Sequence, residues 1–186
     1  MNDRTVIAPA AEPVSVDELK AHLRIVDDTE DALLALYITA AREHAEGQMG
    51  RALAEQTRET SADAFPKSGV LRLGFAPVVS ISSVKYLDEA GAEQTLAPSA
   101  YIVDTRSEPG SIALAVGQSW PATAALPSSV RVQYICGIAA PQILKQAVLF
   151  IAAHWYEQRL PVNVGNIVNE IPHTLDALLW ANRVIS

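Results

Sequence analysis

The fold of this chain is decided by one stretch of sequence, residues 141–159, which reads PQILKQAVLFIAAHWYEQR. Its middle, residues 147–153, carries no polar side chain, and a helix that is apolar on every face must be buried on every face. A chain of 186 residues has few other elements that can cover such a helix. We therefore expect part of its cover to come from another copy of the same chain.

The end of this predicted helix is rich in aromatic and charged residues, which is typical of a docking surface rather than of a reaction centre. The candidate interface residues are Trp155, Tyr156 and Arg159, together with Trp180 from a later segment. They could form core packing between the last two helices. They could equally anchor a subunit interface, where Trp, Tyr and Arg are enriched. The sequence leaves both alternatives open.

The composition indicates a globular protein, because hydrophobic residues make up 49% of the chain and charged residues 19%. Its length suits a single domain. The formal net charge of −7 disfavours non-specific binding to nucleic acid, which needs a basic surface. It does not exclude a protein that lets DNA pass without holding it.

The chain has one cysteine, Cys136, so no disulfide can form within it. We expect a buried, inert thiol and a reducing compartment. No signal peptide is expected, because Asp3 and Arg4 precede only a short apolar run that Pro9 ends. We expect no membrane-spanning segment either, since the uncharged residues 109–130 contain three prolines and two glycines.

The N-terminal third predicts a flexible arm followed by two helices. Residues 1–13 read as the arm, with Pro9 and Pro13. A capping box, with Ser15 as N-cap and Glu18 three residues later, begins the first helix. The second helix is expected from about residue 29 to 49, ending before Gly50. Its expected apolar side comprises Leu33, Leu36, Tyr37, Ala40, Ala41, His44, Ala45, Gln48 and Met49.

Short alternating segments predict strands between residues 53 and 137, with no helix-length connection between them, which favours antiparallel pairing. The expected strands are 53–63, 70–73, 78–87, 94–96, 101–104, 111–115 and 130–136. A long helix (141–159) and a last helix opened by Pro172 follow. The predicted fold class is α+β: helices 15–50, an antiparallel β insertion 53–137 and helices 141–183, all within one domain, 14–186.

Sequence motifs for chemistry are missing: there is no GxGxxG, GxxxxGK, GxSxG, CxxC or HExxH. His154 and Glu157 would share a helix face, but no second such pair completes a metal site. The carboxylates at 27, 28, 30 and 31 favour capping of a helix N-terminus over cation binding. We therefore expect no catalytic residue, no metal and no cofactor. The rival hypothesis is an enzymatic or small-molecule-binding site in the β region, near Tyr86, Tyr101, Asp104 and Arg106.

Several segments, in this order, resemble the head–tail connector (adaptor) proteins of tailed bacteriophages and prophages, in the branch with a β insertion between the helices. The segments are VSVDELKAHLRI (14–25), EDALLALYITAAREHAE (30–46) with GRAL (50–53), LGFAPVVSISSVKYLDEAG (73–91), WP (120–121), VRVQYICG (130–137), QILKQAVLFIAAHWYEQR (142–159) and IPHTLDALLWANR (171–183). The resemblance covers nearly all of the chain after residue 13, except the uncharged loop 109–129.

The resemblance implies a structural role without catalysis. Relatives form a homo-oligomeric ring beneath the portal protein, extend the DNA channel and dock the next connector or a tail protein, and their helices make much of the ring contact. It implies location in the virion at the head–tail junction, after a phase in the host cytoplasm. DNA would pass through the channel without specific binding, and no membrane is involved. A tail-completion or terminator protein, which shares the ring architecture, is the nearest alternative within virion assembly.

Overall fold

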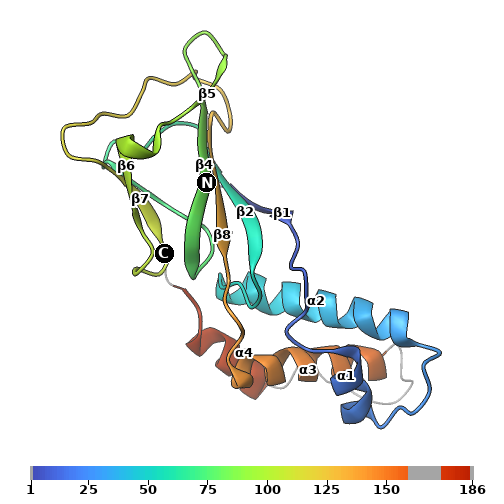
Figure 1. Cartoon of the computed structure of the whole chain (residues 1–186). Coiled ribbons are helices and arrows are strands. Elements are labelled where there is room, and N and C mark those ends of the chain that lie inside the picture. The colour runs from blue at the N-terminus through green and yellow to red at the C-terminus, as the bar shows by residue number, and fades with distance from the viewer. Residues whose placement is uncertain (1, 159–172, 185–186) are drawn as a thin grey trace. The chain divides into compact units, whose positions relative to one another are not determined.

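A computed structural model of the chain describes residues 2–158 and 173–184 (Figure 1). Its contacts divide the chain into two compact units. The β unit contains Met1–Ala10, Gly50–Ile138 and Val184–Ser186, and the helical unit contains Ala11–Met49 and Ala139–Arg183. The sequence predicts one domain over residues 14–186, whereas each unit here has its own packed interior. The fold class is α+β, as predicted.

The helical unit contains α1 (Val16–Leu23), α2 (Asp31–Met49), α3 (Gln142–Glu157) and α4 (His173–Ala181). The predicted capping box is confirmed: the Glu18 amide donates to Ser15 Oγ at 3.1 Å, and the Ser15 amide donates to Glu18 Oε2 at 2.7 Å. The two bonds satisfy backbone donors that a helix N-terminus otherwise leaves unpaired.

Helices α2 and α3 run side by side in opposite directions (Figure 1). Helix α3 buries Leu144, Ala147, Val148, Ile151, Ala152 and Ala153. It is not buried on every face within the chain, because Phe150 at its middle is 49% exposed. The chain alone thus leaves part of α3 uncovered, and cover from another copy stays a prediction.

The apolar stripe expected on α2 is correct in part: Ala41, Ala45 and Met49 are buried as expected, but Leu36 and Ala40 are not. Leu36 is 67% exposed and Ala40 is exposed, whereas Leu34, Ile38, Ala41, Ala45 and Met49 are buried. The buried side includes two charged residues, Arg42 and Glu46, that a hydrophobic pattern assigns to solvent.

These two charges belong to a buried ion network that ties the segment before α1 to α2. Arg42 Nε donates to Glu12 Oε2 at 2.7 Å, and Arg42 Nη1 donates to Glu46 Oε2 at 2.9 Å. Thr39 Oγ1 also donates to Glu12, at 2.9 Å. Buried charges are tolerated when they are paired and hydrogen-bonded. The network therefore explains why α2 turns this side inward.

The β unit contains eight strands in two antiparallel sheets. The strands are β1 (Asn2–Ile7), β2 (Gln56–Ala62), β3 (Val70–Arg72), β4 (Val78–Leu87), β5 (Glu93–Thr95), β6 (Tyr101–Asp104), β7 (Ser111–Leu114) and β8 (Val130–Cys136), with a short 3₁₀ helix at Pro98–Ala100. One sheet has the order β1-β2-β8-β4-β5 and the other the order β3-β7-β6. The predicted strands and their antiparallel pairing are confirmed.

The two sheets lie beside each other in Figure 1 and share one apolar core. Alternate residues of β8, from Val130 to Cys136, are buried in this core, as the period of two in a strand requires. Gly137 follows with φ +93°, and a Cβ there would lie 2.1 Å from the Ala54 carbonyl oxygen. Only glycine fits this approach, so residue 137 ends the strand.

The N-terminal segment is not a flexible arm, because residues 2–7 form β1 and pair with β2. The Asp3 carboxylate accepts hydrogen bonds from Arg58 Nε at 2.5 Å, Thr60 Oγ1 at 2.6 Å and Tyr134 OH at 2.7 Å. Charge-assisted bonds of this kind are stronger than neutral ones. These bonds attach β1, an edge strand, to β2 and β8. Hydrophobic patterning of the sequence does not reveal such polar contacts.

Candidate interaction surface

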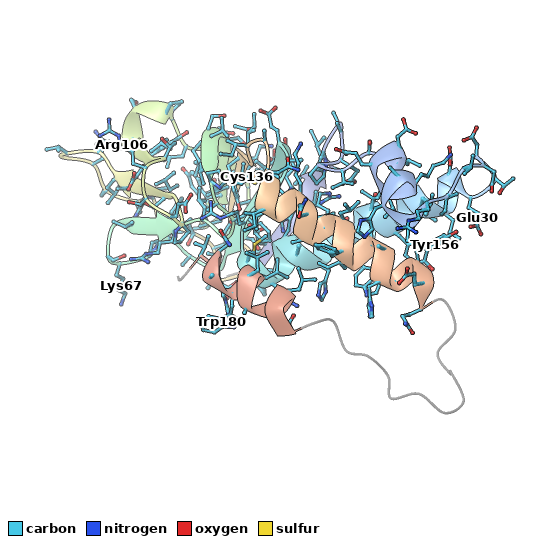
Figure 2. The ribbon with its side chains drawn as sticks, turned by 90° about the horizontal axis from the view of Figure 1, so that it is seen from below. Glu30, Lys67, Arg106, Cys136, Tyr156 and Trp180 are labelled. Atoms are coloured by element: carbon cyan, nitrogen blue, oxygen red, sulfur yellow. The ribbon has the colours of Figure 1, made fainter. Side chains whose placement is uncertain are left out.

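Trp155 and Tyr156 at the end of α3 both pack on α2. The Trp155 ring meets the His44 ring edge to face at 5.5 Å, and Tyr156 meets Tyr37 in the same way at 6.2 Å. The Tyr156 hydroxyl also donates to Glu30, and Figure 2 shows these two residues together at one end of the helices. Both residues are partly buried. The ring contacts of both residues within the described part of the chain are therefore with α2.

Trp180 differs from these two residues because it is 68% exposed. Figure 2 shows it on the side of α4 turned away from α3, and the Arg183 guanidinium lies 5.7 Å from its ring centroid. Leu175 and Leu179, which are not on this exposed side of α4, are buried. Arg159, the remaining candidate, lies outside the described residues.

An apolar groove lies between α1, α3 and α4 of the helical unit. Its volume is about 490 Å³, and its lining comprises His22, Phe150, Ala153, His154, Glu157, Leu175 and Leu178. The His22 ring meets the Phe150 ring edge to face at 5.4 Å, so α1 forms one wall. Hydrophobic patterning does not reveal this groove, although the phenylalanine within the over-apolar helix, Phe150, is a signal for it.

The carboxylates near the start of α2 have structural roles. Lys20 Nζ binds both Asp28 and Asp31, and hydrogen bonds from Lys20 to these two groups raise the Lys20 pKa. The Asp27 carboxylate accepts from the side chain and backbone of Thr29, and these bonds lower its pKa. Over residues 2–158 and 173–184, no group of three His, Cys, Asp or Glu side chains could hold a metal ion.

The residues of the rival site in the β unit do not form a reaction centre. The Asp104 carboxylate serves its own loop: hydrogen bonds from the Ser107 side chain and from the Arg106 and Ser107 amides lower its pKa. Figure 2 shows Arg106 at the outer end of the β unit. The Tyr86 ring packs on Phe65 at 5.9 Å, and burial raises the Tyr101 pKa.

A second, polar groove of about 380 Å³ in the β unit includes Arg4, Glu59 and Arg131 in its lining. Arg4 is paired with Glu59 at 2.7 Å, and Arg131 is paired with Glu93. Each guanidinium is thus neutralised by a carboxylate of the chain itself, which disfavours anion binding. Within the described part of the chain, no helix is both long and apolar enough to cross a membrane.

Comparison with known proteins gives a family match and several structural matches. The family of phage gp6-like head-tail connector proteins matches residues 13–74, which contain α1, α2 and the first strands of the β insertion. No curated protein matches the chain significantly.

The structural matches extend over the whole chain. One is a chain from the neck of an empty gene transfer agent particle computed with C6 symmetry, with 26% identity, a TM-score of 0.78, and coverage of 100% of this chain and 97% of that one. A second, from the virion of the native particle, has 25% identity, a TM-score of 0.76 and the same coverage. A third, from the native neck computed with C12 symmetry, is 24% identical with a TM-score of 0.79 and the same coverage, and shows the shared fold.

The family match over the N-terminal helices and the structural matches over the full length lead to the same conclusion. The chain is similar to the head–tail connector proteins of tailed bacteriophages, as its ordered segments indicate.

Proposed function

We propose that this chain is a structural head–tail connector, which forms a ring under the portal protein, extends the DNA channel and docks the next connector or tail component. One observation carries the proposal. The whole chain shares fold and 26% of its residues with a chain in the neck of a gene transfer agent particle.

The symmetry of those assemblies supports a ring of identical copies, since the necks were computed with C6 and C12 symmetry. A head-to-tail contact closes into a ring when its rotation permits. The helical unit exposes apolar side chains, among them Phe150 and Trp180, that are available for such contacts. Large exposed apolar residues occur on both units, and contiguous patches of such residues are typical of interaction sites.

The acidic balance of the chain supports a channel wall that does not grip DNA. With a formal net charge of −7, the protein repels phosphates on average, and repulsion disfavours lasting contacts with a passing duplex. Neutralising the carboxylates that face the channel in an assembled ring is expected to slow DNA ejection. Ejection kinetics equal to those of the unmodified particle would contradict this part of the proposal.

The absence of catalysis is also part of the proposal. In the described residues, Asp28 and Asp31 bind Lys20, Asp27 accepts hydrogen bonds from Thr29, and Asp104 accepts hydrogen bonds from its own loop. These carboxylates have local structural partners, which supports a structural role rather than a catalytic one.

The proposal is tested by electron microscopy of the purified chain mixed with a portal protein from the same genome. We expect rings of the chain attached to the portal, and the chain at the neck of completed particles. Cell fractions taken before assembly are expected to contain it in the host cytoplasm. A chain that stays detached from portal and particles alike would overturn the proposal.

A further inference from the structure

We propose that the helical unit contacts the next copy through two different faces: the outer face of α2 from one copy docks into the groove between α1, α3 and α4 of its neighbour. This inference rests on the proposed ring function and specifies which surfaces make the ring.

The outer face of α2 is mostly apolar, and its one carboxylate, Glu43, lies 3.6 Å from Arg42 of the same helix. Exposed residues recur along it at helical spacing, namely Ala32, Leu36, Ala40, Glu43 and Gly47. Leu36 is the largest apolar side chain among them. A Cβ added at Gly47 would meet nothing within 4 Å, so the end of this face is open to a close neighbour. The small residues around Leu36 let another surface approach the helix closely.

The groove offers a complementary surface. Phe150, Leu175 and Leu178 supply an apolar lining, and its volume of about 490 Å³ accommodates an aliphatic side chain such as that of Leu36 together with its neighbours. The polar groups of the lining are His22, His154 and Glu157.

Charge disfavours pairing of two α2 faces. Helix α2 carries no exposed lysine or arginine, because Arg42 is buried, and Glu43 is the charged residue of its outer face. Two copies meeting through α2 would bring like charges together.

The two faces point in opposite directions, as a ring requires. Leu36 lies about 200° around α2 from the buried Leu34, since each residue turns the helix by about 100°. On α3, Trp155 lies on the side that meets α2, through His44, whereas Phe150 faces away from α2 into the groove. A copy with unlike contact surfaces on opposite sides associates head to tail, which gives a chain of copies that closes into a ring when the rotation permits, rather than an isolated dimer.

Cysteine pairs test the contact directly. The one native thiol, Cys136, is buried in the β unit, so it does not compete. We expect the double variant Leu36→Cys with Leu178→Cys to form a ladder of covalent trimers and larger oligomers on oxidation in purified particles. Each single variant is expected to stay monomeric. If intact particles that contain the double variant give no ladder, the proposed contact is wrong. Rings of the chain seen by microscopy would still support the connector function in that case.

Charge variants provide an independent test. Leu36→Lys and Leu178→Glu are each expected to lower incorporation into particles at least tenfold, and together to restore it through the new ion pair. The matched control is Val26→Lys, because Val26 is 94% exposed in the same unit but lies on neither face. Thermal unfolding of each isolated variant checks that the chain is folded. Folded Leu36→Lys and Leu178→Glu chains that assemble like the control would refute the proposed contact. Failure of the unmodified chain to enter particles would instead count against the connector function.

Discussion

Replacing Arg42 by methionine is expected to destabilise the helical unit strongly. The guanidinium is almost fully buried and donates to Glu12 at 2.7 Å and to Glu46 at 2.9 Å. Methionine keeps much of the volume but removes the positive charge. The substitution leaves the buried Glu46 carboxylate without its Arg42 partner.

The magnitude follows from the cost of breaking a buried ion pair, which is roughly 3–5 kcal/mol when one partner is removed. This is a large share of the total stability of a domain, about 5–15 kcal/mol. Replacing all three groups together is less harmful, because no buried charge is then left over. The triple variant Glu12→Gln, Arg42→Met, Glu46→Gln is therefore expected to be more stable than Arg42→Met alone.

Urea denaturation followed by far-UV circular dichroism measures the effect. With a slope of about 1–3 kcal/mol per molar urea, the midpoint is expected to fall by roughly 1–5 M. The matched control is Arg106→Met, since Arg106 is exposed. Surface substitutions of this kind change stability by about 0.5 kcal/mol at most. A loss below about 1 kcal/mol for Arg42→Met, or a triple variant less stable than it, would refute the reasoning.

The other expected outcomes concern both units. Trp155→Ala is expected to lower the free energy of unfolding by about 2–3 kcal/mol, less than the 3–5 kcal/mol of a fully buried tryptophan, because its ring packs on His44 but stays partly exposed. Trp180→Ala is expected to change stability by less than about 0.5 kcal/mol and to weaken assembly, so a large loss in thermal unfolding would contradict its surface role. Burial, and then the charge of Asp3, raise the Tyr134 pKa, so the folded chain keeps this proton when the unfolded chain loses it at about pH 10. Stability is thus fully present below that pH and falls as pH rises further. Tyr134→Phe is expected to flatten this decline. The free energy of unfolding, measured by urea denaturation at a series of pH values, would disprove it if it fell equally steeply with pH in both chains. Asp3→Ala removes the shared acceptor of Arg58, Thr60 and Tyr134, so amide hydrogen exchange in residues 2–7 is expected to speed up at least tenfold, with exchange in β8 as the internal reference. Unchanged protection of residues 2–7 would show that strand pairing alone holds β1.

The elements of the fold follow from local sequence features. The pairing of Ser15 with Glu18 marks the start of α1, and Gly50 marks the end of α2 with φ +65°. Alternation in residues 78–87 and 130–136 predicts β4 and β8 within the observed bounds. Such signals are reliable because capping and the period of a strand depend on residues close together in the chain.

Features that depend on distant residues were missed. Strand β1 is held by the contacts of Asp3 with residues more than 50 positions away, and the side of α2 that is buried is set by Glu12 and Arg42, 30 positions apart. A polar residue in a sequence gives no sign of whether it will find a buried partner, so hydropathy assigns it to solvent.

For the interaction surface, too, local sequence determined some features and tertiary packing determined others. The residue order of α3 alone determines that an over-apolar helix with an aromatic end must exist, because its periodicity is a property of consecutive residues. Tertiary packing then decided which of those side chains remain uncovered. It placed Trp155 and Tyr156 against α2, and it left Phe150 in a groove with residues of α1 and α4. Exposure depends on which helices lie beside one another, and that choice rests on the free energy of the whole packed unit rather than on any one segment.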